Sequence, residues 1–372
     1  MRIAFRADAS LQIGIGHVMR CLTLADALRA QGAECHFISR AHPGHLMDAI
    51  GRGGFGVMPL PAELPPSPAS IRTVCDAAPW HMHAGWLGSD WQTDARQTRE
   101  ALGGMRPDWL VVDHYALDQQ WETALRPYCR KLMVIDDLAD RPHHCELLLD
   151  QNLGRHREDY AALVGVQCEV LTGPQYALLR PEFAALRPYS LQRRREPTLG
   201  HLLISMGGMD LPNATGQVLQ ALTTCPLPQG CRISVVMGLQ APWLPQVRSH
   251  ALDMPLPTNV LVDIPDMAQR MADSDLAIGA AGSTSWERCC LGLPTLVVAL
   301  AENQWPGAHA LMHAQAASLL GGVGDIARQL PPAVQAATQG SRLRHMSTAA
   351  SALTSGQGVA KVLQALAVSH DS

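Results

Sequence analysis

The sequence predicts an α/β protein of two domains, each with a parallel β-sheet covered by helices. Short apolar runs of strand length alternate with amphipathic helical patterns, which is typical of parallel sheets. This alternation restarts after a polar segment near the middle of the chain. The length of 372 residues agrees with this prediction, because it exceeds one ordinary domain and suits two.

The first half of the chain contains five expected strands. They lie at residues 2–5, 34–38, 109–112, 132–135 and 147–149. A proline-rich segment, 59–68, begins a longer connection that resumes with an expected helix at 90–102. We interpret residues 60–105 as an insertion near one edge of the sheet.

The second half repeats the pattern after a polar run, Gln192–Glu196, which we interpret as a solvated linker. Its expected strands lie at 202–205, 233–237, 260–262, 276–279 and 295–299, and its closing helices at 341–367. We expect an N-terminal domain at 1–190, a linker at 191–198 and a C-terminal domain at 199–372. Since open α/β sheets bind ligands at the carboxyl ends of their strands, facing sheets would form a cleft between the domains.

Composition excludes several classes of function. Hydrophobic residues make up 47% of the chain, no apolar run approaches the roughly 20 residues that span a bilayer, and the net charge is −4. We expect a cytoplasmic protein with no nucleic-acid partner and no membrane insertion. The ten cysteines lack C-x-x-C spacing, and the contiguous run His143-His144-Cys145 is a poor chelator. No metal ion or cofactor is expected.

A glycine loop that presents a histidine follows the first strand. Gly14, Gly16 and His17 precede a helical pattern that begins at Val18. The positive end of a helix dipole disfavours imidazolium, so a histidine there tends to be neutral and able to act as a general base. The alternative is a hydrogen bond within the turn, and the spacing alone does not decide between the two. The replacement of the third glycine of G-x-G-x-x-G by Met19 argues against a dinucleotide-dependent oxidoreductase.

Two further loops in the second half have the small residues that a phosphate needs nearby. Gly207 and Gly208 follow one expected strand, and the segment 280–284 follows another. Glu287, in the next helix, can accept both hydroxyl protons of a ribose. Thr284-x-x-Glu287 is equally a helix capping box, and both interpretations stay open.

Together these motifs resemble sugar-nucleotide enzymes of the GT-B fold, to which the lipid II-forming GlcNAc transferase is similar in pattern. More specifically, the chain resembles the UDP-sugar hydrolases of pseudaminic acid biosynthesis from residue 1 to about residue 320. Four segments sharpen this resemblance: Val112–Tyr115, Asp136-Asp137, Pro142–Asn152 and Gly173–Phe183.

The resemblance implies a GT-B-like fold of two Rossmann-like domains and a hydrolase that releases UDP from UDP-2,4-diacetamido-2,4,6-trideoxy-β-L-altropyranose. Water would attack the anomeric carbon with inversion and without a metal ion. The free sugar would be used for pseudaminic acid, a nonulosonic acid of surface glycans such as those of flagellin. The alternatives are a GT-B glycosyltransferase with a UDP-sugar donor, and a sugar-nucleotide sensor without enzymatic activity.

The resemblance also assigns site residues. It implies that His17 is the base and that Tyr115 and Asn303 lie near the reacting centre. The implied substrate-binding residues are Asp8, Gly14, Gly16, Arg180, Gly207, Gly208, Ala281, Gly282, Ser283, Thr284, Glu287 and Gln304. Whether Asp8 or Asp113 orients His17 stays open, and the oligomeric state is not predicted.

Overall fold

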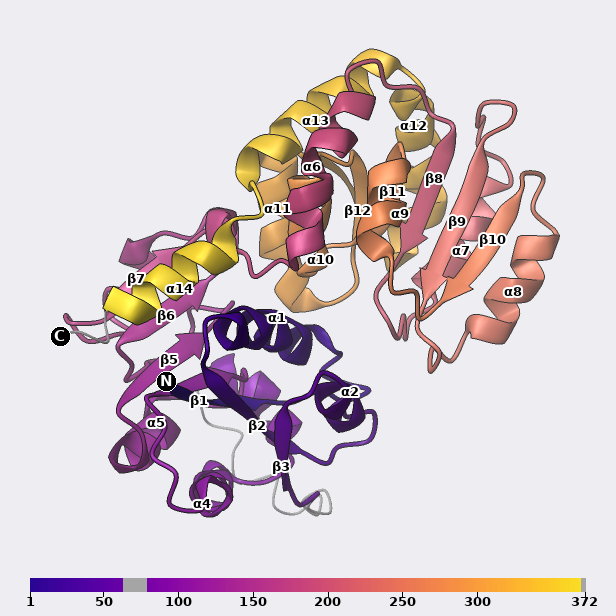
Figure 1. Ribbon diagram of the computed structural model, residues 1–372. Helices are drawn as coiled ribbons and strands as arrows, with labels where there is room; N and C mark the ends of the chain where they lie inside the picture. Colours follow the sequence, from indigo (N-terminus) through magenta and orange to yellow (C-terminus); the bar gives the residue numbers. More distant parts are fainter. Residues whose placement is uncertain (63–78, 369–372) are drawn as a thin grey trace. The chain divides into compact units, whose positions relative to one another are not determined.

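The computed structural model describes residues 1–62 and 79–368, and the chain divides into two compact units (Figure 1). The first unit comprises Met1–Leu178 together with the C-terminal segment that begins at Val359, and the second comprises Leu179–Gly358. Each unit contains one parallel sheet flanked by helices, which confirms the predicted α/β class.

In the described residues, the sheet of the first unit has seven parallel strands in the order β3-β2-β1-β4-β5-β6-β7. Its strands are β1 (Arg2–Ala7), β2 (Glu34–Arg40), β3 (Gly56–Leu60), β4 (Trp109–Asp113), β5 (Lys131–Ile135), β6 (Leu147–Asp150) and β7 (Glu169–Thr172). The five expected strands are present, whereas β3 and β7 were not predicted.

The helices of the first unit include short 3₁₀ segments, labelled η. They are α1 (Gly16–Ala30), α2 (Met47–Arg52), η1 (Pro79–Leu87), α4 (Trp91–Leu102), α5 (Gln119–Leu125), η2 (Arg126–Tyr128), η3 (Arg157–Tyr160), η4 (Pro174–Tyr176) and α14 (Gly358–Val368). Helix α4 confirms the helix expected at 90–102, and its amide nitrogen at Thr93 is capped by Asp90 at 2.7 Å.

The described residues of the second unit form a sheet of six parallel strands in the order β10-β9-β8-β11-β12-β13. Its strands are β8 (His201–Ser205), β9 (Arg232–Met237), β10 (Thr258–Val262), β11 (Leu276–Ala280), β12 (Thr295–Ala299) and β13 (Ala317–Gly322). Only β13 was not predicted.

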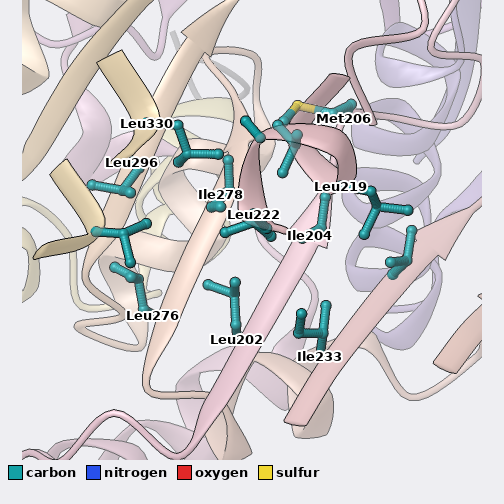
Figure 2. Packing of buried hydrophobic residues seen from close by; sticks show 14 of the residues in the cluster. Leu202, Ile204, Met206, Leu219, Leu222, Ile233, Leu276, Ile278, Leu296 and Leu330 are labelled. Carbon is teal, nitrogen blue, oxygen red and sulfur yellow. The ribbon is translucent and has the colours of Figure 1, made fainter. Parts of the chain in front are cut away.

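The helices of the second unit cover this sheet. They are α6 (Pro181–Arg193), α7 (Ala214–Leu222), α8 (Leu244–Leu252), α9 (Met267–Asp273), α10 (Thr284–Cys290), η5 (Glu302–Gln304), α11 (Trp305–His313), η6 (Val323–Asp325), α12 (Ile326–Ala337) and α13 (Gly340–Leu353). Figure 2 shows strand residues such as Ile204 and Ile278 packed with Leu219 and Leu330 of the helices, and this packing fixes the strand ends from which the loops emerge.

The strand order reverses once near the middle of each sheet. In the first unit, β1 continues outward to β2 and β3, while the chain returns on the other side of β1 as β4. In the second unit the same reversal separates β8 from β11. Connections diverge at such a point and leave a crevice at the carboxyl ends of the two strands, so the loops after β1, β4, β8 and β11 are the expected places for ligands.

The division into units differs from the expected boundaries at 190 and 198. The run Gln192–Glu196 is not a free linker, because it joins the end of α6 in the second unit. Arg194 is 4% exposed, and its guanidinium donates hydrogen bonds to the backbone oxygens of Met271 and Ser274 at 3.0 and 2.7 Å. These buried contacts hold the segment to the second unit.

The expected connection that begins at 59 also needs correction. Pro59 lies inside β3, which pairs with β2 and is the edge strand of the sheet in the described residues. A proline is tolerated there because one side of an edge strand needs no amide donors. The rest of the proline-rich segment, from 63 on, lies outside the described residues.

The C-terminal helix α14 belongs to the core of the first unit rather than to the C-terminal domain in which it was expected. Val362 and Leu366 are buried in the same hydrophobic cluster as Ile3 and Phe5 of β1. The ammonium group of Lys361 lies 5.3 Å from the centre of the Tyr176 ring. The first unit is therefore completed by residues from both ends of the chain.

We predict that Leu366→Ala destabilises the first unit by about 2–5 kcal/mol, because it removes a fully buried side chain and leaves a cavity. The matched control is Gln364→Ala, since Gln364 is exposed on the same helix. Hydrogen exchange of first-unit amides measures the effect separately from the second unit. Equal exchange in the two variants would contradict the placement of α14.

Candidate active site

The turn between β1 and α1 places His17 in the first turn of the helix, as expected. Gly14 has a φ of +79°, which favours glycine, and its amide donates to the Ser10 carbonyl at 2.9 Å. The Ser10 hydroxyl accepts from the amide of Ile13, also at 2.9 Å. Helix α1 then begins at Gly16 without a side-chain cap. The turn is therefore held by its own hydrogen bonds, and the first amides of the helix are not capped by a side chain.

Asp113, at the end of β4, orients His17. The Nδ1 atom of His17 lies 2.5 Å from Asp113 Oδ1, and the two side chains are 9% and 0% exposed. Because Nδ1 faces a carboxylate, it carries the proton, and Nε2 is the nitrogen with a free lone pair in the neutral ring. This resolves the choice between Asp8 and Asp113 that the sequence left open. It also answers the alternative of a bond within the turn, since the partner of His17 comes from another strand.

Arg20 fixes the carboxylate of Asp113 in turn. Its Nε donates to Oδ2 at 2.6 Å and its Nη2 to Oδ1 at 2.7 Å, which is a bidentate pairing. Burial by itself would raise the pKa of Asp113, but Arg20 and then His17 outweigh it and hold that pKa well below its usual range. Asp113 therefore stays ionised beside the imidazole.

Tyr115 packs against His17 and belongs to the same network. The two rings meet edge to face with centroids 4.6 Å apart. The Tyr115 hydroxyl donates to Asp137 at 2.7 Å, and Asp137 also accepts from Arg20 at 3.0 Å. Burial, together with the neighbouring Asp137, raises the pKa of Tyr115. The structure thus places Tyr115 beside the expected base, and the Tyr115 hydroxyl proton is donated to Asp137.

Asp8 is buried inside the first unit. It is fully buried, its Oδ1 accepts from Arg6 at 2.6 Å and from the backbone amide of Arg40 at 2.7 Å. The bond from the Arg40 amide joins the end of β1 to β2. The carboxylate of Asp8 is therefore inside the protein, with Oδ1 bound to the neighbouring strand, and its contact with substrate stays a prediction.

A buried group that sequence reasoning missed lies behind this network. The Tyr160 hydroxyl is 2.9 Å from Asp136 Oδ2 and 2.8 Å from Asp150 Oδ2. One hydroxyl proton cannot serve both carboxyl groups at once, and each also has a cation nearby, Arg141 at 2.9 Å from Asp136 and Arg155 at 3.1 Å from Asp150. Burial and the charge of Asp137 raise the pKa of Asp150 to about 7. Burial by itself would raise the pKa of Asp136, but Arg141 outweighs it and holds that pKa well below its usual range. Of the two acids, Asp150 is therefore the one whose surroundings favour the protonated form.

The glycine loop after β8 is shaped by a buried aspartate. Gly207 has a φ of +86°. Asp210 accepts from the amides of Ala214 and Thr215, both at 2.8 Å, and so occupies the start of α7. In the part of the chain that the structure describes, the amides of Gly207 and Gly208 donate no hydrogen bond. A phosphate at this loop would meet the glycine amides rather than the helix end.

The loop after β11 offers a run of uncommitted amides. The amide of Ala281 donates to the Val298 carbonyl at 3.1 Å and is not available to a ligand, which limits its expected role. The amides of Gly282, Ser283 and Thr284 donate no hydrogen bond within the described residues, and α10 begins without a side-chain cap. This loop is the stronger of the two candidates for a diphosphate site.

Glu287 does not form the capping box that its spacing allowed. Its carboxylate makes no hydrogen bond within the described residues, although Arg180 and Arg288 act on it electrostatically. Burial raises the pKa of Glu287 to about 7, against the effect of the two arginines. Arg180 itself pairs with Glu182 at 3.1 Å. The carboxylate of Glu287 is half-buried and remains available to a ligand.

Asn303 and Gln304 lie on η5, after β12. The Gln304 Oε1 accepts from the amide of Leu300 at 3.0 Å, and its Nε2 is the atom nearest to where a Cβ on Gly282 would lie, at 3.9 Å. Asn303 is exposed. The structure therefore brings Gln304 to the 281–284 loop of the same unit.

The histidine run 143–145 is engaged by the protein. His143 Nδ1 lies 2.7 Å from Glu122 Oε1, and the His144 amide donates to the same carboxylate. Among the described residues, no three His, Cys, Asp or Glu side chains gather in a way that could hold a metal ion. In those same residues, no helix has the length and apolar character needed to cross a membrane.

The two sheets and the loops at their points of reversal define a protein of the GT-B fold. MurG of Acinetobacter baumannii has a TM-score of 0.69 with this chain at 15% identity, covering 98% of this chain and 99% of MurG. The spinosyn rhamnosyltransferase SpnG has a TM-score of 0.62 at 16% identity, covering 98% of this chain and all of SpnG. At these identities the likeness shows the fold alone.

The particular resemblance is to the UDP-2,4-diacetamido-2,4,6-trideoxy-β-L-altropyranose hydrolase of Campylobacter jejuni. The identity is 27% over 307 residues, which cover 82% of this chain and 93% of that protein, and it confirms the resemblance inferred from the motifs. The spore coat polysaccharide biosynthesis protein SpsG of Bacillus subtilis is 30% identical over 158 residues, 42% of this chain and 45% of SpsG.

An uncharacterised protein of Methanocaldococcus jannaschii is 23% identical over 303 residues, which cover 80% of this chain and 55% of that protein. The chain thus spans about half the length of this relative and of SpsG. No family model matches the chain.

We predict that the stability of the first unit falls as pH rises from about 4 to about 7, because the pKa of Asp150 is raised to about 7 in the folded protein. A raised pKa means that folding favours the protonated acid, so its contribution is complete below the unfolded pKa near 4 and is lost as pH rises through 7. Asp150→Asn, which cannot ionise, should weaken this dependence of the melting temperature.

The control for that measurement is Asp48→Asn, since Asp48 is exposed on α2 of the same unit and should leave the pH dependence unchanged. Melting curves of the three proteins at pH 5, 6, 7 and 8 provide the comparison. An Asp150→Asn variant that keeps the full slope would show that Asp150 is ionised across this range.

Proposed function

We propose that this protein is a hydrolase that releases UDP from a UDP-sugar, with UDP-2,4-diacetamido-2,4,6-trideoxy-β-L-altropyranose as the substrate. The observation that carries the proposal is the buried pair of His17 and Asp113 at the carboxyl ends of β1 and β4. The similarity to the Campylobacter hydrolase supports the choice of substrate. The free sugar would supply pseudaminic acid for surface glycans, including those of flagellin, in the cytoplasm.

His17 acts as the general base in this proposal. Its Nε2 accepts a proton from water while the water oxygen attacks the anomeric carbon. The bond between that carbon and the oxygen of the β-phosphate breaks, and UDP leaves with the bonding electrons. Attack opposite to the leaving group inverts the anomeric carbon. Asp113 stabilises the imidazolium that forms, since it stays ionised at 2.5 Å from Nδ1.

The second unit binds UDP in this proposal. The amides of Gly282, Ser283 and Thr284, with those of Gly207 and Gly208, donate to the diphosphate and stabilise the charge that develops as UDP leaves. The carboxylate of Glu287 accepts the ribose hydroxyl protons. Asn303, Gln304 and Arg180 complete the substrate contacts. Gly14 and Gly16 admit the substrate close to the backbone next to His17.

We predict that His17→Ala lowers the rate of UDP release by about 10²- to 10⁴-fold, the range expected when a general base is removed. UDP affinity should change little, because the proposed UDP contacts lie in the second unit. The assay measures UDP release from the diacetamido-trideoxy-altrose nucleotide with no acceptor added, and calorimetry measures UDP binding.

His36→Ala is the control for this experiment, because His36 lies on β2 and pairs with Glu34, away from the proposed base. A His17→Ala variant with a near-normal rate would sink the assignment. Release by the wild type only after an envelope lipid or glycan acceptor is added would instead identify a glycosyltransferase. Binding without release under either condition would identify a sensor.

We predict that UDP binds more tightly as pH rises through 7, because only the ionised form of Glu287 can accept both ribose protons and its pKa is raised to about 7. Between pH 6 and pH 8 the ionised fraction of a carboxyl with a pKa of about 7 rises about tenfold, which sets the upper limit of the effect. Glu287→Gln should bind UDP more weakly at pH 8 and retain only the dependence that the phosphate itself contributes. Titration calorimetry of both proteins at the two pH values tests this, and equal pH dependence would contradict the role of Glu287.

A further inference from the structure

A group of aromatic rings that the mechanism does not use continues outward from His17. His83 and Trp86 lie on η1, and both pack on Tyr115, whose other neighbour is His17. The Trp86 and Tyr115 rings are stacked, with centroids 5.7 Å apart and planes at 25°. The His83 centroid lies 4.4 Å from that of Trp86 and 5.2 Å from that of Tyr115. The four rings thus form one packed cluster in the first unit, in which His17 and Tyr115 are buried and His83 and Trp86 are half-buried.

We infer that His83 and Trp86, together with Tyr115, form the wall that binds the sugar of the UDP-sugar and selects a sugar that carries methyl and acetamido groups. The inference rests on the proposed function, because it takes His17 as the base. It adds two residues and a basis for specificity that the motifs did not indicate, since the sequence gives His83 only the context of a loop between predicted elements.

The position of the wall follows from the reaction. Water activated by Nε2 of His17 must reach the anomeric carbon, so the sugar ring lies within a few ångströms of this imidazole. Tyr115 meets the His17 ring at 4.6 Å, and Trp86 and His83 extend the same surface. A sugar placed for attack therefore lies beside these rings.

The chemistry of the wall suits an unusually apolar sugar. The proposed substrate has a methyl group at C6 in place of a hydroxymethyl, and two acetamido methyl groups. Trp86 and His83 are half-buried, so part of each ring remains open for contact with such groups. Burial, the largest cause, lowers the pKa of His83, which favours an uncharged ring at neutral pH. An uncharged imidazole can pack on apolar groups and still form a hydrogen bond with an amide.

Aromatic residues are rare in this chain, so a cluster of them next to His17 is significant. The sequence has only 8 Trp, 5 Tyr and 4 Phe among 372 residues. Trp86 nevertheless lies in a segment between β3 and α4, half-exposed, and stacks on the one tyrosine that contacts the proposed base. Aromatic side chains that line part of a pocket are a common means of binding small ligands.

The test compares two substrates of different polarity. UDP release is measured from the diacetamido-trideoxy-altrose nucleotide and from UDP-GlcNAc, which has a C6 hydroxyl group. We expect Trp86→Ala to reduce the preference of the wild type for the first substrate by about 10- to 200-fold, the discrimination that one methyl group gives in an apolar pocket. The loss should appear mainly in KM, and Trp86→Phe should restore most of it. His83→Ala should reduce the preference in the same direction.

Trp243→Ala is the matched control, since Trp243 is 38% exposed on the second unit. Hydrogen exchange of first-unit amides, measured for every variant, shows that the unit carrying Trp86 and His83 is folded, and calorimetry with UDP shows the same for the second unit. If Trp86→Ala keeps the substrate preference of the wild type while the wild type hydrolyses the substrate, the inference that these rings bind the sugar is wrong. The proposed function would not be affected by that result.

A second readout separates failure of the wall from failure of the proposed function. Saturation-transfer difference NMR with the free 2,4-diacetamido sugar reports contacts of its methyl protons and needs no hydrolysis. Transfer to the methyl protons in the wild type that disappears in Trp86→Ala supports the wall even if no UDP is released from any substrate. Methyl transfer that is equal in both proteins overturns it.

Discussion

The ionised carboxylate of Asp113 is the interaction on which the first unit's site depends. It lies at the end of a central strand, fully buried, where an unpaired charge would be very costly. Arg20 and His17, both on α1, satisfy its two oxygens. The strand end and the helix start are therefore joined by charge-assisted bonds, and His17 is left with one ring nitrogen free. Arg20 also donates to Asp137, which accepts from Tyr115, so the same cation organises the residues around His17.

Both units use the same topological device. In each unit the chain leaves a central strand, forms a loop and enters a helix on both sides of the point where the strand order reverses. In the first unit these loops follow β1 and β4, and in the second they follow β8 and β11. The carboxyl ends of parallel strands lie at the same edge of the sheet, so residues that are far apart in the sequence come together there. The residues of these loops can therefore differ between the two units although the two sheets have the same topology.

Much of the fold was predictable because buried parallel strands are apolar and helices have their own period. His17 at a helix start was equally predictable, since glycines mark the turn. Its partner was not, because the contact with Asp113 spans 96 residues and depends on β4 lying beside β1. The packing of α14 on the first unit likewise depends on tertiary contacts that the sequence pattern does not show. Edge strand β3 was not predicted because it contains a proline. The capping box at Thr284 was a local possibility that the structure does not use.

The groups that contact His17 differ from those of the 282–284 loop in whether the protein itself provides their hydrogen-bond partners. Around His17, each carboxylate and cation has partners within the protein, which fixes the imidazole before any ligand arrives. At the 282–284 amides and Glu287, the described chain provides no hydrogen-bond partners, and Glu287 remains partly desolvated as well. Unpaired polar groups lower stability, so folded proteins retain few of them without a use. A fixed imidazole in one unit and unpaired donors and acceptors in the other are what the proposed function requires, since it assigns the activation of water to His17 and the binding of the nucleotide to the second unit.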